Sequence, residues 1–177
     1  AAFWAPADNS VAMRPWNTEK LGNAVSSVRF APGITEVGAY AFYYQERSDI
    51  TSATFNRNLK IHLPDSLEKM SQATFMSLNA SDIAVPSSVT TLSTRLFGTL
   101  SRLYVLGDPD IVVPSVSTSS FAVNSGTTVY AATGSKLSTT SGITNMTLVE
   151  VDAIGACGTE KGYASELVWM VQGDTLT

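Results

Sequence analysis

Histidine and cysteine are almost absent from this sequence of 177 residues, which has one of each, His62 and Cys157. A single cysteine permits no internal disulfide, and it leaves the redox compartment open. One histidine and one cysteine at distant positions give no metal-ligand spacing, so we expect no metal site. A Ser-His-Asp triad is also disfavoured, because the only histidine would need a nucleophile and an orienting carboxylate beside it.

Charged residues are also few, at 15% of the sequence, and the net charge is −4. Such a composition offers no basic field for nucleic acid and no Lys/Arg-rich amphipathic stretch for an anionic membrane. No apolar run approaches the roughly 18 to 20 residues that a membrane helix needs. The glycines stand singly, without a G-x-G-x-x-G or G-K-[ST] phrase. We therefore expect no cofactor, no nucleic-acid partner and no membrane insertion.

What the sequence does contain is a repeated phrase. It consists of two apolar residues two positions apart, usually a proline, two further apolar residues and a phenylalanine. Counted from the proline position, which is Ala31, Pro64 or Pro86, the inner apolar residues follow at three and six and the phenylalanine at eleven. The three clear copies span 28–42, 61–75 and 83–97, and a degraded fourth copy spans 103–121.

The phenylalanines that close the four copies lie 33, 22 and 24 residues apart; they are Phe42, Phe75, Phe97 and Phe121. A period in the twenties predicts a stacked solenoid, in which each unit buries its apolar edge only against its neighbours. Because the phenylalanines keep the phase of the repeat, we expect them to form a stacked core column rather than an aromatic platform for sugars.

The repeat also divides the chain. About ten residues beyond the period separate the first two copies, and the strand register between 50 and 60 stays open. The sequence has no initiator methionine and no signal peptide, so we interpret it as a piece of a longer protein. We expect four parts: an irregular leader over 1–24 whose Trp4 and Trp16 pack on the first coil, repeats over 25–125, cap strands over 126–154, and the start of a further module over 155–177.

The repeated phrase resembles the unit of the BspA-like leucine-rich repeat family, which reads approximately L-x-x-V-x-I-P-x-x-V-x-x-I-G-x-x-A-F. Gly38, Ala41 and Phe42 match the end of this unit, whereas the second copy has Ser71 in place of the glycine and the third copy departs at both the glycine and the alanine. The resemblance implies a mostly β, right-handed leucine-rich-repeat solenoid with short helical or 3-10 turns and β-rich caps.

The same resemblance implies a location and a role. Members of the family are mostly described as secreted or attached to the surface of bacteria, with adhesion to host or matrix components as the usual proposal. For this chain we accordingly expect an extracellular or cell-surface location, a monomer, and a host or matrix protein or glycan as partner.

Candidate binding residues follow from strand geometry. Side chains alternate along a strand, so if the apolar pair of each copy points inward, the residues before and between its members point outward. Stacked coils place these outward residues about 4.8 Å apart from strand to strand. Arginine and tyrosine are enriched at binding hot spots, although ordinary solvated strand residues give the same pattern. The predicted ladder consists of Arg29, His62, Ala84 and Tyr104, flanked by Ser27, Lys60, Asp82 and Arg102.

Three functions are compatible with these observations. The first is a non-catalytic binding or adhesion solenoid, which engages a protein or glycan through the charged and aromatic members of the ladder: Arg29, Lys60, His62, Asp82, Arg102 and Tyr104. The second is a polysaccharide-acting β-helix enzyme, for which Lys60, Asp82 and Arg102 are the only plausible trio. The third is a structural spacer without a ligand. Because a solenoid usually presents an extended surface, we predict the first function and no enzymatic activity.

Overall fold

Short strands with alternating burial make up most of the structure, a computed structural model that describes residues 26–42, 60–76, 80–98, 100–112, 126–140, 146–157 and 167–177 and the backbone of 2–3. Successive side chains of a strand point to opposite sides, so each strand can bury one side and expose the other. The prediction of a mostly β fold is confirmed.

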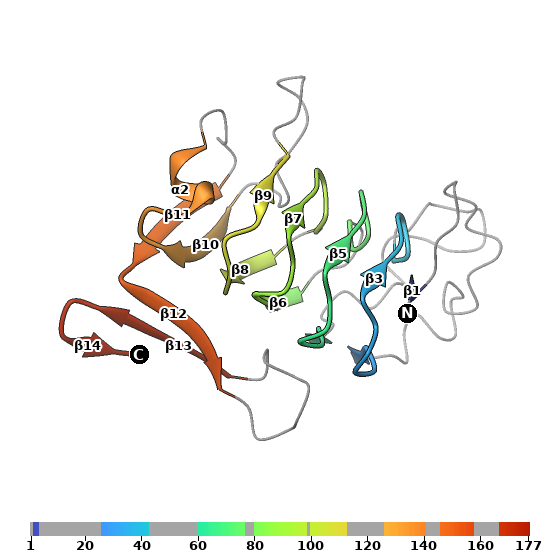
Figure 1. Ribbon diagram of the computed structural model, residues 1–177, viewed down its shortest axis with the longest axis horizontal. Helices are drawn as coiled ribbons and strands as arrows, with labels where there is room; N and C mark the ends of the chain where they lie inside the picture. The colour runs from blue at the N-terminus through green and yellow to red at the C-terminus, as the bar shows by residue number, and fades with distance from the viewer. Residues whose placement is uncertain are drawn as a thin grey trace.

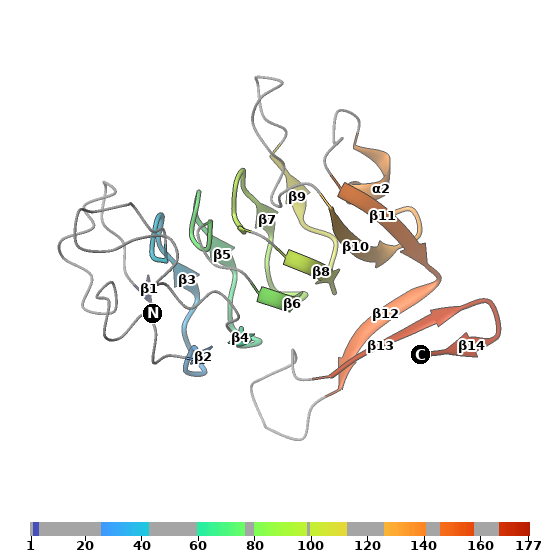
Figure 2. The same cartoon turned by 180° about the vertical axis from the view of Figure 1, so that it is seen from behind.

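Six strands form a first row along the molecule (Figures 1 and 2). All the pairings in this row are parallel, and they make two separate sheets, β2-β4 and β6-β8-β10-β11. The strands are β2 (Ser27–Arg29), β4 (Lys60–His62), β6 (Ala80–Val85), β8 (Leu100–Val105), β10 (Thr127–Ala132) and β11 (Met146–Val151).

A second row consists of one five-stranded parallel sheet in the order β1-β3-β5-β7-β9. Unlike the first row, this sheet continues without interruption from the leader to the fourth copy of the repeat (Figure 1). Its strands have two residues each: β1 (Ala2–Phe3), β3 (Glu36–Val37), β5 (Lys69–Met70), β7 (Thr91–Leu92) and β9 (Asp110–Ile111).

Equivalent positions of the repeated phrase are partners across the strands. Val28 pairs with Ile61 in the first row, and Lys69 pairs with Thr91 in the second, 22 residues later (91 − 69). The fourth unit is shorter, because Ile83 pairs with Leu103 after a step of 20 residues (103 − 83). The spacing of the phrase therefore matches the register of both rows.

The connection between the two rows is the same in each of the first three copies. A backbone N–H donates to the carbonyl three residues earlier, which closes a tight turn at the proline position. The bonds run from Ile34 to Ala31, from Leu67 to Pro64 and from Val89 to Pro86, at 3.2, 3.0 and 3.1 Å. The fourth copy differs: Gly107 lies so close to the backbone of Ser87 that a Cβ there would come within 2.8 Å of the Ser87 Cα.

The turn before each phenylalanine contains a residue in the left-handed region. These residues are Tyr40, Ala73 and Arg95, with φ of 56°, 55° and 53°, and each follows its proline position by nine. A left-handed residue interrupts a right-handed helix. The expected short helical or 3-10 turns are accordingly missing from the described parts of the repeats, and the helix that the structure describes, α2 (Lys136–Thr139), lies beyond them.

The core lies between the two rows, and phenylalanines form a column through it. Phe75 stacks on Phe42 with ring centroids 5.4 Å apart and on Phe97 with centroids 5.9 Å apart. All three are buried, and Phe30 packs edge-on against Phe42 and Phe75. The predicted column is confirmed for these three copies; Phe121 lies outside the described residues. The inward members of the apolar pairs are also in the core: Val28, Phe30, Ile61, Leu63, Ile83, Val85, Leu103 and Val105.

The leader is not irregular throughout. Ala2 pairs with Glu36 and Phe3 with Val37, so the backbone of β1 adds an edge strand to the second row. This corrects the prediction of a wholly irregular segment, which rested on a lack of apolar periodicity; two residues are too few to show a period. Trp4, Trp16 and the open register between 50 and 60 lie outside the described residues.

The C-terminal strands extend the first row and then leave it. In β10, Val129 pairs with Leu103 of β8 and with Leu148 of β11. After Asp152 the chain forms an antiparallel meander of β12 (Ala153–Cys157), β13 (Leu167–Gln172) and β14 (Thr175–Leu176), which extends from the end of the row (Figure 1). The expected boundary between 154 and 155 thus falls inside β12, and the division into modules stays a prediction.

Candidate functional site

The outward side of the first row, which we call the strand face, carries two ladders of side chains. In one ladder Asp82, Arg102 and Thr128 are partners on β6, β8 and β10. In the other, two residues further along each strand, Ala84 is the partner of Tyr104 and Tyr104 of Tyr130. On β2 and β4 the equivalent partners are Ser27 with Lys60 and Arg29 with His62.

The predicted outward residues all lie on strands of this row, and their exposure follows the expected alternation. Arg29, Lys60 and Arg102 are exposed, and His62, Asp82 and Tyr104 are half-buried, whereas the apolar residues between them are buried. Ala84 is the exception: it was predicted as an outward rung, but it is only 4% exposed. Its single methyl group is shorter than its neighbours, so the side chains around it shield it from solvent.

Asp82 and Arg102 form a two-pronged ion pair across β6 and β8. The Arg102 Nε donates to Oδ1 at 2.5 Å and Nη2 donates to Oδ2 at 3.1 Å. This hydrogen bonding to Asp82 raises the pKa of Arg102 above its ordinary value, so the guanidinium stays charged. Since both side chains are well exposed, the pair adds only about 0–1 kcal/mol of stability, and its main effect is to neutralise Asp82.

Tyr104 and Tyr130 stack on the strand face with ring centroids 5.1 Å apart and an angle of 17° between the rings. Burial raises the pKa of the Tyr104 phenol above its ordinary value, and the nearby Asp82 and Tyr130 act in the same direction. The phenol is therefore protonated at neutral pH and can donate a hydrogen bond. Sequence reasoning missed Tyr130, because its segment was read only as a cap; the alternation of Thr128, Val129 and Tyr130 was the available signal.

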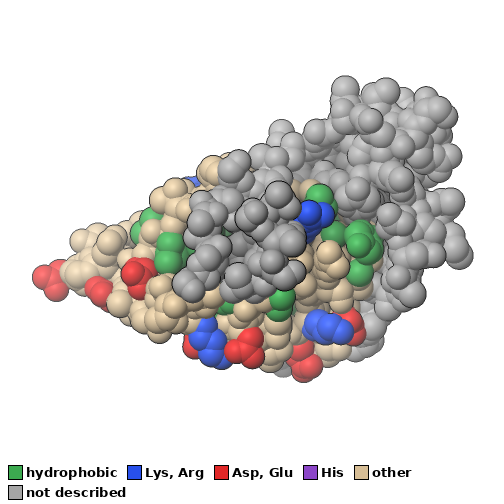
Figure 3. Space-filling view, turned by 90° about the horizontal axis from the view of Figure 1, so that it is seen from above, with side chains coloured by type: hydrophobic (Ala, Val, Ile, Leu, Met, Phe, Trp, Pro, Cys, Tyr) green, Lys and Arg blue, Asp and Glu red, His purple; other side chains and the backbone are tan. Residues whose placement is uncertain are grey.

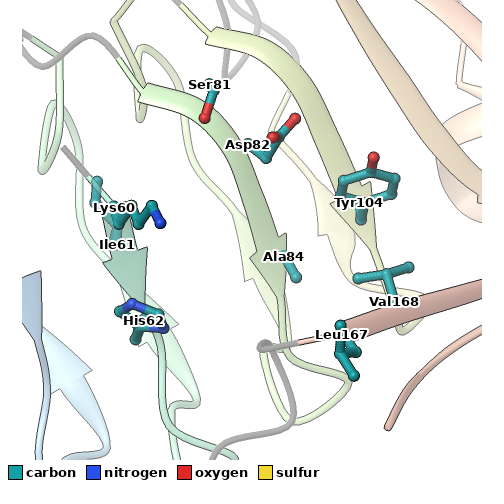
Figure 4. A pocket seen from close by; sticks show the side chains of 9 residues that line it. All are labelled: Lys60, Ile61, His62, Ser81, Asp82, Ala84, Tyr104, Leu167 and Val168. Atoms are coloured by element: carbon teal, nitrogen blue, oxygen red, sulfur yellow. The ribbon is translucent and has the colours of Figure 1, made fainter. Parts of the chain in front are cut away.

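A hollow of about 360 Å³ opens on the strand face between β4 and β6 (Figure 4). These two strands are neighbours in space but belong to different sheets. The hollow combines four of the predicted residues with two apolar residues of β13 that sequence reasoning did not place there. Its lining consists of Lys60, Ile61, His62, Ser81, Asp82, Ala84, Tyr104, Leu167 and Val168.

The hollow has a polar end and an apolar end. In Figure 4 the Lys60 side chain extends toward Ser81 and Asp82, and Leu167 and Val168 stand at the opposite end, below Tyr104. Among the described residues, the Lys60 ammonium has no ion-pair partner, whereas Asp82 is paired with Arg102. A positive charge is thus the uncompensated charge of this site.

Arg29 does not line the hollow, and Arg102 borders it only through Asp82. The structure therefore divides the six predicted residues: Lys60, His62, Asp82 and Tyr104 share one site, and Arg29 lies one strand further away on β2. The sequence showed which side of each strand they occupy, but the covering by β13 comes from a segment some 60 residues later in the chain.

The second row offers less. Its outward charges are paired, Lys69 with Glu36 at 2.8 Å and Lys136 of α2 with Asp110 at 2.8 Å. In the view from above, basic and acidic side chains lie next to one another along one edge instead of gathering into a patch of one sign (Figure 3). A shallower hollow of about 270 Å³ lies over β5 and β7, beside Val112.

Two further searches cover the parts of the chain that the structure describes. Within them, no three His, Cys, Asp or Glu side chains come close enough together to hold a metal ion. In the same residues no helix has both the length and the apolar character needed to cross a membrane.

Comparisons of this chain with family models, with curated proteins and with solved structures each found no match. The resemblance to BspA-like repeats therefore stays a resemblance of the repeated phrase, and the function has to be argued from the strand face itself.

Proposed function

We propose that this chain is a binding module built as a leucine-rich-repeat solenoid, and that it engages a protein or glycan through the strand face. Three observations support the solenoid: parallel pairing at the spacing of the phrase, recurrence of the same turn in each copy, and the phenylalanine column. Each unit contacts the next along two rows of short strands, as expected for a stack of repeats.

The binding role depends chiefly on one observation, the hollow beside the tyrosine stack. Tyr104 and Tyr130 present a rigid aromatic surface, and tyrosine gives a large contact area together with a hydrogen-bonding hydroxyl. The hollow of about 360 Å³ is within the range of about 300–1,000 Å³ that is usual for ligand sites. Aromatic, charged and apolar groups thus converge on one place of an otherwise regular surface.

The same geometry gives less support to polysaccharide cleavage. Glycoside hydrolysis uses two carboxyl groups as a rule. Asp82 is the one carboxylate among the described residues that line the hollow, and both of its oxygens accept hydrogen bonds from Arg102. We therefore propose binding without catalysis.

A secreted or surface-attached bacterial protein is the setting that we propose for this module. The support is the resemblance of the phrases at 28–42, 61–75 and 83–97 to BspA-like repeats, whose members are mostly described from such locations. The host or matrix partner that the resemblance implies is part of the same proposal.

The proposal is tested by immobilising the purified chain and measuring binding to a glycan array and to a panel of matrix proteins. We expect at least one ligand, whose affinity falls about tenfold or more in the double variant Tyr104→Ala/Tyr130→Ala. The matched control is Lys69→Ala/Thr91→Ala on the second row, which should bind like the wild type. If no member of either panel binds, or if the control loses as much affinity as the tyrosine variant, the strand face is not the binding surface and a spacer role becomes the better explanation.

A further inference from the structure

One rung of the tyrosine ladder is empty of any ring. Tyr130 covers one face of Tyr104, and on the other side the partner of Tyr104 is Ala84, which has only a methyl group. Ala84 forms the floor of the hollow, with Tyr104 and His62 on its two sides (Figure 4). The free face of the Tyr104 ring therefore borders a space that a larger residue at position 84 would fill.

The size of this space suits one ring-shaped group. Strands of a sheet are about 4.8 Å apart, so each rung of the ladder has room for one ring in contact with the next, as Tyr104 and Tyr130 show at 5.1 Å. The volume of about 360 Å³ lies at the lower end of ligand sites, and it fits a single ring with its substituents better than an extended oligomer.

The charges and hydrogen-bonding groups select the kind of ring. Lys60 supplies the uncompensated positive charge at the polar end, where the Ser81 hydroxyl also lies. The phenol of Tyr104 and the imidazole of His62 add polar atoms at the sides, and Leu167 and Val168 close the other end with apolar surface. An apolar ring face with several hydroxyls and one carboxylate on its rim matches this distribution.

We propose, on the basis of the binding role proposed above, that the hollow binds one carboxylate-bearing pyranose ring of a glycan, with the C–H face of the sugar against Tyr104 and its carboxylate at Lys60. A charge-assisted contact of this kind is stronger than a neutral hydrogen bond, so it distinguishes acidic from neutral sugars. An aromatic side chain of an acidic peptide would use the ring space and the lysine, but it would leave the polar groups at the sides without partners.

The test is a titration of the full 177-residue chain followed by NMR, with methyl glucuronide, the methyl glycoside of N-acetylneuraminic acid, and neutral methyl glucoside as probes. We expect at least one acidic sugar to bind at least tenfold more tightly than methyl glucoside, and the two acidic probes distinguish a uronic from a sialic acid. Saturation transfer should reach the ring protons of the bound sugar from aromatic protons of the protein.

Two variants and one control make the test specific. Ala84→Phe fills the empty rung without removing a polar group, and it should abolish binding while circular dichroism shows an intact fold. Lys60→Gln should lower the affinity for the acidic sugar about tenfold and leave the affinity for methyl glucoside unchanged. Lys69→Gln, the same change on the second row, should alter neither.

Several outcomes overturn the inference. Equal affinity for acidic and neutral sugars, full binding by Ala84→Phe, or binding of an acidic aromatic peptide with no binding of either acidic sugar would each show that the hollow is not an acidic-sugar site. The proposed binding role would survive these results if a panel ligand still lost affinity in the Tyr104→Ala/Tyr130→Ala variant. If the tyrosine variant also had no effect on any ligand, both proposals would fail together.

Discussion

Phe75 is the residue on which the core depends most. It lies in the middle of the column, stacks on a ring on either side, and is 1% exposed. Its neighbours in the column come from different copies of the repeat, so its ring joins three units at once.

We expect Phe75→Ala to lower the free energy of unfolding by about 3–5 kcal/mol, because it removes a buried ring and leaves a cavity between two others. Urea denaturation followed by circular dichroism measures the change. Tyr130→Ala, which removes a half-buried ring from the strand face, should cost clearly less. A loss below about 1 kcal/mol for Phe75→Ala would contradict the column as the centre of the core.

At this scale much of the structure could be predicted from the sequence. The fixed offset of eleven residues identified Phe42, Phe75 and Phe97 as equivalent, and the alternation of apolar and polar residues identified the outward side chains. The burial of Ala84 could not be predicted in this way, because it depends on the size of neighbours from other strands. Tyr130 was missed for a related reason: its rung is set by the pairing of β10 with β8.

At the scale of the elements, the turn before each phenylalanine is the most regular feature of the backbone. The left-handed residue recurs at the same place in three copies, and none of the three is a glycine. Non-glycine residues in this region carry a strain of about 1–2 kcal/mol. The repeat therefore keeps this conformation through the surrounding hydrogen bonds, such as those from Tyr40 N–H to the Gln72 carbonyl and from Phe42 N–H to the Thr74 carbonyl.

Arg95 allows this strain to be measured, since its side chain is not buried. We expect Arg95→Gly to raise the free energy of unfolding by about 0.5–1 kcal/mol, as relief of strain outweighs the greater freedom of glycine in the unfolded chain. Arg95→Val should lower it, because a β-branched residue tolerates the left-handed region poorly. The two midpoints of urea unfolding should therefore move in opposite directions; if both variants are destabilised alike, the turn is held by the arginine side chain instead.

The elements also show where sequence reasoning ended. Expected helical turns proved to be hydrogen-bonded turns with a left-handed residue, a difference that the apolar pattern does not encode. The edge strand β1 and the placement of β13 beside the hollow both depend on contacts between segments far apart in the chain. Local periodicity predicts which side of a strand is buried, but it does not predict which distant segment lies on the exposed side.

At the scale of the whole molecule, the two rows differ in continuity. The second row is one sheet from β1 to β9, whereas the first row is divided between β4 and β6. At this division β4 is paired on one side only, with β2, while β8 is paired on both sides.

We expect backbone amides of β4 to exchange with deuterium faster than those of β8, because local opening requires fewer strand pairings to break. Amides of β5, which belongs to the same unit as β4 but is paired on both sides, provide the matched comparison. Hydrogen exchange read out by NMR at neutral pH gives the individual rates. Equal protection of β4 and β8 would mean that the side chains around the hollow hold the two sheets together as firmly as pairing does.

The divided row and the continuous row together make the stack able to bend. Flexing about the unbroken sheet leaves its pairings intact and changes the distance between β4 and β6, where no pairing resists it. Mechanical load applied to the ends of the chain would then widen or narrow the space above Ala84. We expect the grip of this protein on whatever occupies that space to respond to tension.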